Sequence, residues 1–200
     1  MFKSITRSAA MLFVITTNVF ISPAQQSSNK PVPSLSADEV MTRTLPTVSD
    51  GVWKRYSPEG FGISFELPGD PNERSYPVPP ELRSQISAAK IFDYAEESFI
   101  ATVTHIVLAK RMELMLMARE MRKSLYRSDD FQNVKISLIP KQDRVLVSGS
   151  FSRFGREIDV RGFFVGSGEE VWFVFVQIVR DRQEGSAACA RILDSVTRNR

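Results

Sequence analysis

A change of hydrophobic period along the chain is the feature that most constrains its fold. Between residues 61 and 67 every second position is apolar, as in a strand with one buried side, and Gly62, Ser64 and Glu66 are expected on the other side. Turn chemistry precedes this run, and two prolines in Pro68-Gly69-Asp70-Pro71 end it by removing backbone donors. Further segments rich in Val, Ile, Thr and Phe predict strands at about residues 74–78, 86–94, 98–108, 134–138, 144–152, 157–165 and 171–179.

Two segments have helical period instead. Residues 111–127 predict a helix whose core stripe is Leu114, Met117, Ala118, Met121 and Leu125. The same spacing leaves Arg119, Glu120, Arg122 and Lys123 for water. Residues 183–197 predict a second helix, and its apolar face includes Cys189, which is therefore expected in the core.

These elements predict one α+β domain. The run Val171–Val176 is apolar at every position, which suits a strand that is covered on both faces. An antiparallel sheet of about six to eight strands, with both helices packed on it, would bury all the apolar stripes together. The single cysteine permits no internal disulfide, so this domain must be stabilised by its core.

The N-terminal quarter of the chain predicts export. Lys3 and Arg7 precede an apolar run, and small residues follow at Ser22-Pro23-Ala24, so residues 1–24 are expected to be a cleaved signal peptide. Residues 25–50 are rich in Ser and Pro and predict a linker to a single domain at residues 51–200. Cleavage would leave 24 basic and 23 acidic side chains, which is unlike a nucleic-acid-binding protein. No stable membrane insertion is expected after cleavage, so the sequence predicts a periplasmic or extracellular location.

The order of these elements resembles that of the PsbP-like domains. The resemblance is carried by Gly60-Phe61, the strand that follows, Pro68 and Pro71, and by Ile192-Leu193-Asp194-Ser195-Val196 in the terminal helix. It covers residues 51–200 and implies an α/β/α sandwich around an antiparallel sheet. It also implies docking to a partner rather than catalysis, although fold alone does not specify function.

Two patterns that often carry chemistry are weak in this sequence. His105 is the only histidine and alternates with apolar residues, so we expect it to be packed rather than to bind a metal. Ser87 and Lys90 match a Ser-x-x-Lys nucleophile motif, but their surroundings predict a strand, which would carry Lys90 away from Ser87. The sequence therefore indicates no catalytic residue, metal ligand or cofactor site.

The helix at residues 111–127 has more apolar surface than one buried face requires. Met112, Met115 and Leu116 fall outside its core stripe, and Arg119 lies beside them. We interpret these four residues as the candidate docking surface for a protein partner. The sequence thus favours an exported accessory or binding domain; the alternatives are a carrier of a small apolar ligand and a hydrolase of the cell envelope.

Overall fold

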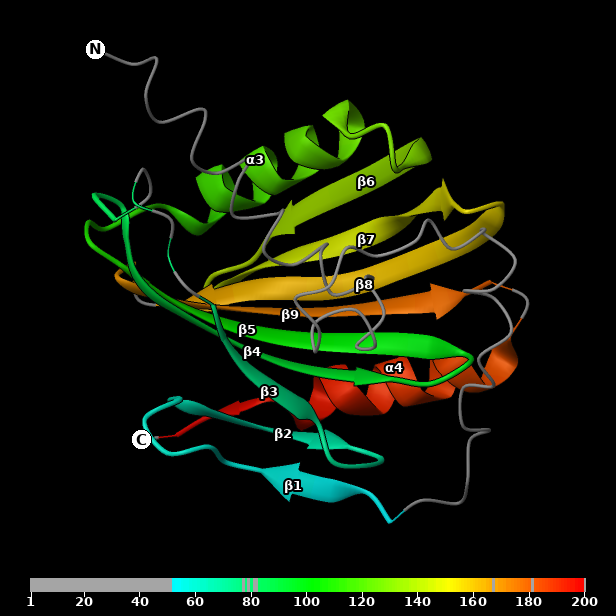
Figure 1. Ribbon diagram of the computed structural model, residues 1–200, viewed down its shortest axis with the longest axis horizontal. Helices are drawn as coiled ribbons and strands as arrows, with labels where there is room; N and C mark the ends of the chain where they lie inside the picture. Colours follow the sequence, from blue (N-terminus) through cyan, green and yellow to red (C-terminus); the bar gives the residue numbers. More distant parts are fainter. Residues whose placement is uncertain are drawn as a thin grey trace, which may run out of the picture.

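The computed structural model describes residues 52–199, except residues 77, 79, 81, 82, 167 and 181. The predicted signal peptide and linker lie outside the described residues. Figure 1 shows the arrangement of the described elements, which form one seven-stranded and one three-stranded antiparallel sheet with two helices. The α+β class predicted from the sequence is therefore confirmed.

The large sheet has the strand order β3-β4-β5-β9-β8-β7-β6, within the predicted range of six to eight strands. Every pair of neighbouring strands is antiparallel. The seven strands are β3 (Asn72–Tyr76), β4 (Ile86–Ala95), β5 (Phe99–Leu108), β6 (Gln132–Pro140), β7 (Arg144–Arg153), β8 (Arg156–Gly166) and β9 (Glu170–Val179).

The small sheet is an addition that the sequence did not predict. It has the order β1-β2-β10, with β1 at Lys54–Tyr56, β2 at Ile63–Leu67 and β10 at Thr197–Arg198. The strand expected to have one wet side is β2, but Ser64 is buried because its hydroxyl lies between Thr197 and Arg55. The prediction that Ser64 faces water is therefore wrong.

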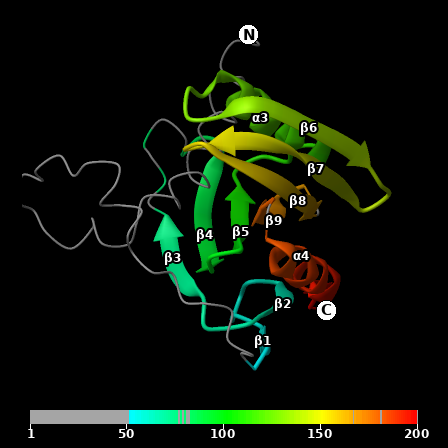
Figure 2. The same ribbon diagram turned by 90° about the vertical axis from the view of Figure 1, so that its right-hand side faces the viewer.

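Strand β9 shows why the large sheet needs cover on both faces. Trp172, Val174, Val176 and Ile178 pack in one cluster with β2 and helix α4 (Gln183–Ser195). Phe173 and Phe175 point to the opposite face and pack in a second cluster with helix α3 (Leu114–Arg127). The continuous apolar run is thus a strand buried on both sides, as predicted. Figure 2 shows the same elements from the side.

Both helices are shorter than the sequence predicted. Helix α3 begins at Leu114 rather than Arg111, because the Met112 amide donates to the Gly168 carbonyl in the β8–β9 turn at 2.9 Å. Helix α4 ends at Ser195 because Thr197 and Arg198 pair with β2 as a strand. Each helix end is therefore decided by a contact distant in sequence.

Candidate functional site

Three of the four residues of the candidate docking surface, Met115, Leu116 and Arg119, lie on α3, and Met112 lies just before the helix. Leu116 is 37% exposed and Arg119 is exposed. Met112 and Met115 are half-buried and contact the core cluster beneath the helix. Beside Met112, between the start of α3 and the β8–β9 turn, lies a hollow of about 450 Å³ that is also lined by Arg111, Glu113, Leu114, Gly166 and Gly168.

The exposed side of α3 continues to its C-terminal end. Lys123, Tyr126 and Arg127 are exposed and follow Leu116 and Arg119 at helical spacing, so they share one face. Tyr126 is 57% exposed and was missed by sequence reasoning, although its spacing from Leu116 and Arg119 was visible in the sequence. We define the α3 face as Met112, Met115, Leu116, Arg119, Lys123, Tyr126 and Arg127.

One acidic residue of α3 does not lie in water as predicted. Glu120 is only 4% exposed, and its carboxylate lies 2.5 Å from the ammonium group of Lys123. The pair explains the burial, since a buried carboxylate needs a cation or hydrogen-bond donors. Because Glu120 is buried and paired with Lys123, the net charge that α3 presents to solvent is positive.

His105 is packed, as the sequence predicted. It is 7% exposed and its ring lies parallel to the Trp172 indole, with 5.0 Å between centroids and 4° between planes. Phe61 meets the ring edge-on with its centroid at 5.3 Å. Burial, together with the charge of Lys90, lowers the pKa of His105 below 6.5, against the opposing effect of Glu170. Its Nε2 atom has no hydrogen-bond partner among the described residues.

His105 lies on the wall of a hollow of about 650 Å³ near one end of β4, which we call the β4 hollow. The hollow is lined by Ser75 of β3, by Val78 and Arg83 between β3 and β4, by Ile86, Ser87, Ala88, Ala89 and Lys90 of β4, and by His105 and Val107 of β5. A shift of register between Ile86 and Ala88 interrupts the β4–β5 pairing at this point. Small side chains and this irregularity leave the space open.

The Ser-x-x-Lys pattern lies in a strand, as predicted, yet both of its residues line the β4 hollow together with His105. The Lys90 ammonium is engaged by the Glu73 carboxylate at 2.5 Å. Among the described residues no hydrogen bond joins Ser87 to Lys90 or His105. A nucleophilic serine needs a base within hydrogen-bond reach, so the observed contacts do not assemble one.

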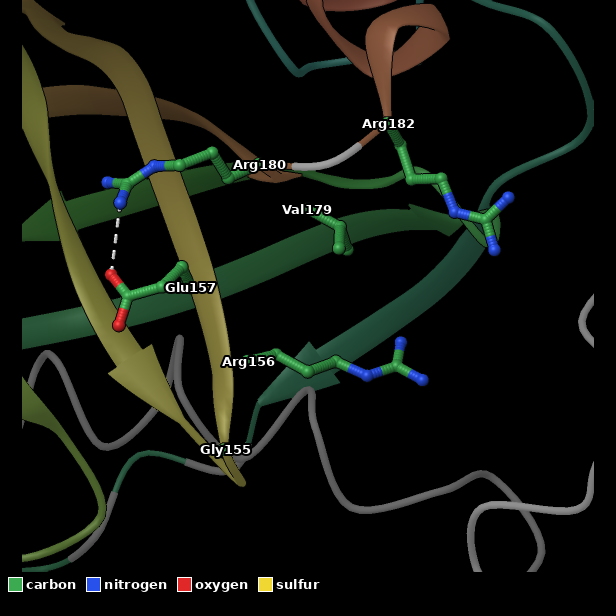
Figure 3. Close-up of a pocket in the computed structure, with 6 residues that line it drawn as sticks. All are labelled: Gly155, Arg156, Glu157, Val179, Arg180 and Arg182. Carbon is green, nitrogen blue, oxygen red and sulfur yellow. Dashed lines mark hydrogen bonds and ion pairs between the residues drawn. The ribbon is translucent and has the colours of Figure 1, made fainter.

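A second polar hollow, of about 440 Å³, lies where β8 begins and β9 ends (Figure 3). Arg156 and Arg182 extend in one direction, whereas Arg180 turns toward Glu157. Arg180 pairs with Glu157 at 3.2 Å and with Asp159 at 2.7 Å, and Arg182 pairs with Glu97 at 2.5 Å. The positive charge at this hollow is largely balanced by carboxylates.

The part of the chain that the structure describes contains neither a cluster of metal-ligating side chains nor a membrane-spanning helix. No group of three or more His, Cys, Asp or Glu side chains lies close enough there to hold a metal ion. None of the helices in the described ranges combines the length and the apolar character that crossing a membrane requires.

The fold places the chain in the class of α+β proteins with an antiparallel sheet covered by helices. No protein-family model matches the sequence, and no curated protein is significantly similar to it. The cyanobacterial PsbP of Synechocystis sp. PCC 6803 is a similar solved structure, with 10% identity, a TM-score of 0.46, and coverage of 80% of this chain and 99% of that one. A PsbP is thus among the similar structures, as the resemblance in the sequence implies, and the likeness concerns the fold alone.

Two further solved structures are similar at the same level. LpqN, described as involved in cell envelope biogenesis of Mycobacterium tuberculosis, has 14% identity and a TM-score of 0.38, over 76% of this chain and 80% of that one. A protein of unknown function from Pseudomonas aeruginosa has 13% identity and a TM-score of 0.36, over 70% of this chain and 92% of that one. Similarity this distant carries no argument about activity or partners.

Proposed function

We propose that the chain is an exported, non-catalytic binding domain that docks through the α3 face onto an acidic surface of a protein partner, in the cell envelope or outside the cell. The observation that carries this proposal is the pairing of exposed apolar and cationic side chains along one helix. Leu116 and Tyr126 provide apolar contact, and Arg119 and Arg127 lie among them. Interfaces commonly combine aromatic, Met and Arg side chains in this way.

The charge of α3 decides the chemistry of the partner. Between Leu114 and Arg127 the helix has four cations and one carboxylate, and that carboxylate is the buried Glu120. A surface with complementary negative charge would associate faster and in a defined orientation. The hollow beside Met112, where Arg111 and Glu113 also line the wall, offers space for a side chain of the partner.

The two alternatives have less support. A carrier of an apolar ligand needs an apolar cavity, whereas the β4 hollow has Arg83 and Lys90 on its walls. A hydrolase needs a nucleophile engaged by a base, and the Ser87 hydroxyl makes no such contact within the described residues. An anionic membrane would also attract the α3 cations, but the near-neutral charge expected of the mature chain provides little long-range attraction.

Site-specific photo-crosslinking in the original host tests the docking proposal. A photoreactive amino acid is placed at Leu116 in one variant and at Lys135 in a control variant. Lys135 is exposed on β6, beside Ile136, whose side chain points into the core under α3. The proposal expects a reproducible protein crosslink from position 116 and none from position 135. Equal crosslinking from both positions would contradict docking through α3.

The identified partner is then purified and its affinity measured with charge-reversal variants. Arg119→Glu should raise the Kd at least tenfold, and Lys135→Glu should change it less than twofold. Raising the salt concentration should weaken the wild-type complex, because exposed charges are screened. Unchanged affinity of Arg119→Glu, with an unchanged melting temperature, would overturn the proposal. Saturable binding of the wild type to vesicles rich in anionic lipid, abolished by the same variant, would replace it with a membrane role.

A further inference from the structure

The β4 hollow has the chemistry of an anion-binding site that is separate from the α3 face. Among the described residues, two cationic side chains, Arg83 and Lys90, and two hydroxyl side chains, Ser75 and Ser87, line it, and no carboxylate does. Ala88 and Val107, which are register partners at the strand irregularity, add apolar lining. Cationic and hydroxyl donors beside an apolar lining suit a ligand with oxygen acceptors.

The cations of the hollow remain available to a ligand. Arg83 is exposed, and within the described part of the chain its Nε donates a long hydrogen bond of 3.4 Å to the Val78 carbonyl. Lys90 is paired with Glu73, but that carboxylate is about half exposed and lies outside the hollow lining. An ion pair this accessible to water stabilises the fold only slightly, so an anion can compete for the ammonium group.

His105 adds an independent observation. A buried ring nitrogen without a hydrogen-bond partner costs free energy, and nearly all such groups in proteins find a partner. Among the described residues that line the hollow, only His105 has a buried side-chain polar atom without a hydrogen-bond partner, and that atom is Nε2. Its ring orientation is fixed by stacking on Trp172, so the acceptor must come to the ring.

We propose that the β4 hollow binds a small oxyanion, a phosphate or carboxylate group, held by Arg83 and Lys90 and hydrogen-bonded to His105. This site is independent of docking through α3, since the two share no residue. Phosphate and carboxylate are two sources of the same recognition chemistry, and titration with each distinguishes them.

The chain provides an unusually clean probe of this site, because it has one histidine. Protein labelled with ¹⁵N only at histidine is titrated with inorganic phosphate, with acetate, and with sodium chloride at matched ionic strength. The proposal expects a saturable shift of the single Nε2 resonance with phosphate or with acetate, and no saturation with chloride. Equal, non-saturating shifts with all three salts would overturn it.

Two substitutions that break the same ion pair sharpen the test. Lys90→Met removes a proposed ligand and should raise the Kd for the bound anion at least tenfold. Glu73→Gln removes the competing carboxylate, frees the ammonium group, and should lower the same Kd about threefold. A merely structural role of the pair would move both variants in the same direction. Lys135→Met, distant on β6, is the matched control for loss of one positive charge and should leave the Kd unchanged.

Discussion

The His105 imidazole lies flat against the Trp172 indole, and the indole Nε1 donates a hydrogen bond of 2.5 Å to the Phe61 carbonyl. These contacts tie β5, β9 and the segment before β2 together at one point. The large sheet is thereby connected to the small sheet through one polar contact inside an apolar layer. The surroundings of His105 also remove it from water, which determines how it responds to pH.

Acidification should destabilise the fold in a window set by His105. Its pKa in the folded chain lies below the unfolded value of 6.5, because burial and the Lys90 charge oppose protonation. Between these two pKa values the unfolded chain binds more protons than the folded chain, so stability falls as pH falls through this window. Above the unfolded value the contribution is fully present. Denaturant unfolding at pH 7.5 and at successively lower pH measures the loss.

The control is His105→Phe, which cannot be protonated and keeps an aromatic ring for stacking. The variant should show a smaller loss of stability than the wild type between pH 7 and pH 5.5. Histidine NMR should give a single titration with its midpoint below 6.5. A midpoint above 6.5, or the same pH dependence in both proteins, would contradict the assignment.

Replacing each of the two tryptophans separates the Phe61 hydrogen bond from ordinary packing. Trp172→Phe leaves the Phe61 carbonyl without its donor in a buried site and should cost roughly 2–4 kcal/mol of unfolding free energy. Trp53→Phe, on a half-buried ring that packs at the edge of the core and lies under the Arg191 guanidinium, should cost less than about 1 kcal/mol. Chemical denaturation monitored by circular dichroism measures both. Equal losses of unfolding free energy in the two variants would show that the hydrogen bond to Phe61 adds nothing to the stability that Trp172 provides.

The sequence predicted segments that overlap all seven strands of the large sheet and both helices, and most of them have a clear hydrophobic period, although β3 (Asn72–Tyr76) does not. It also predicted the double burial of Val171–Val176, and the packing of His105. It did not predict β1 or β10, since Lys54–Tyr56 has no apolar alternation and Thr197 becomes a strand only by pairing with Ser64. A partner that distant along the chain leaves no local pattern.

The candidate sites, too, were predictable only where they depend on local sequence pattern. Leu116 and Arg119 of the α3 face were available from helical spacing, because exposure on a helix follows from its period. Glu120 was assigned to water by that rule, and it is buried because Lys123 neutralises it. The β4 hollow was not predictable, since it depends on a strand irregularity that opens space between residues of different strands.

Cys189 should resist alkylation in the folded protein. It lies on the core-facing side of α4 and is fully buried, and burial raises the pKa of its thiol to about 11. Only the thiolate reacts, and at pH 8 about one thiol in a thousand is ionised at that pKa. Labelling with iodoacetamide at pH 8 should therefore begin only at denaturant concentrations where circular dichroism shows unfolding. Complete labelling within minutes in native buffer would show that the core opens locally around α4.

The two glycines at the start of β2 should respond differently to the same substitution. Gly60 and Gly62 both have positive φ, 67° and 75°, so alanine strains the backbone at either position by roughly 1–2 kcal/mol. A Cβ at Gly62 would also lie 2.6 Å from Cζ2 of Trp172, whereas a Cβ at Gly60 would meet no atom within 4 Å.

Trp172 is buried and held by its hydrogen bond to Phe61, so it cannot move away without breaking that bond. Gly62→Ala should therefore cost roughly 1–3 kcal/mol more than Gly60→Ala, the usual penalty of overpacking. Measured unfolding free energies that agree within 0.5 kcal/mol, about the error of such comparisons, would mean that the indole does not press on this backbone.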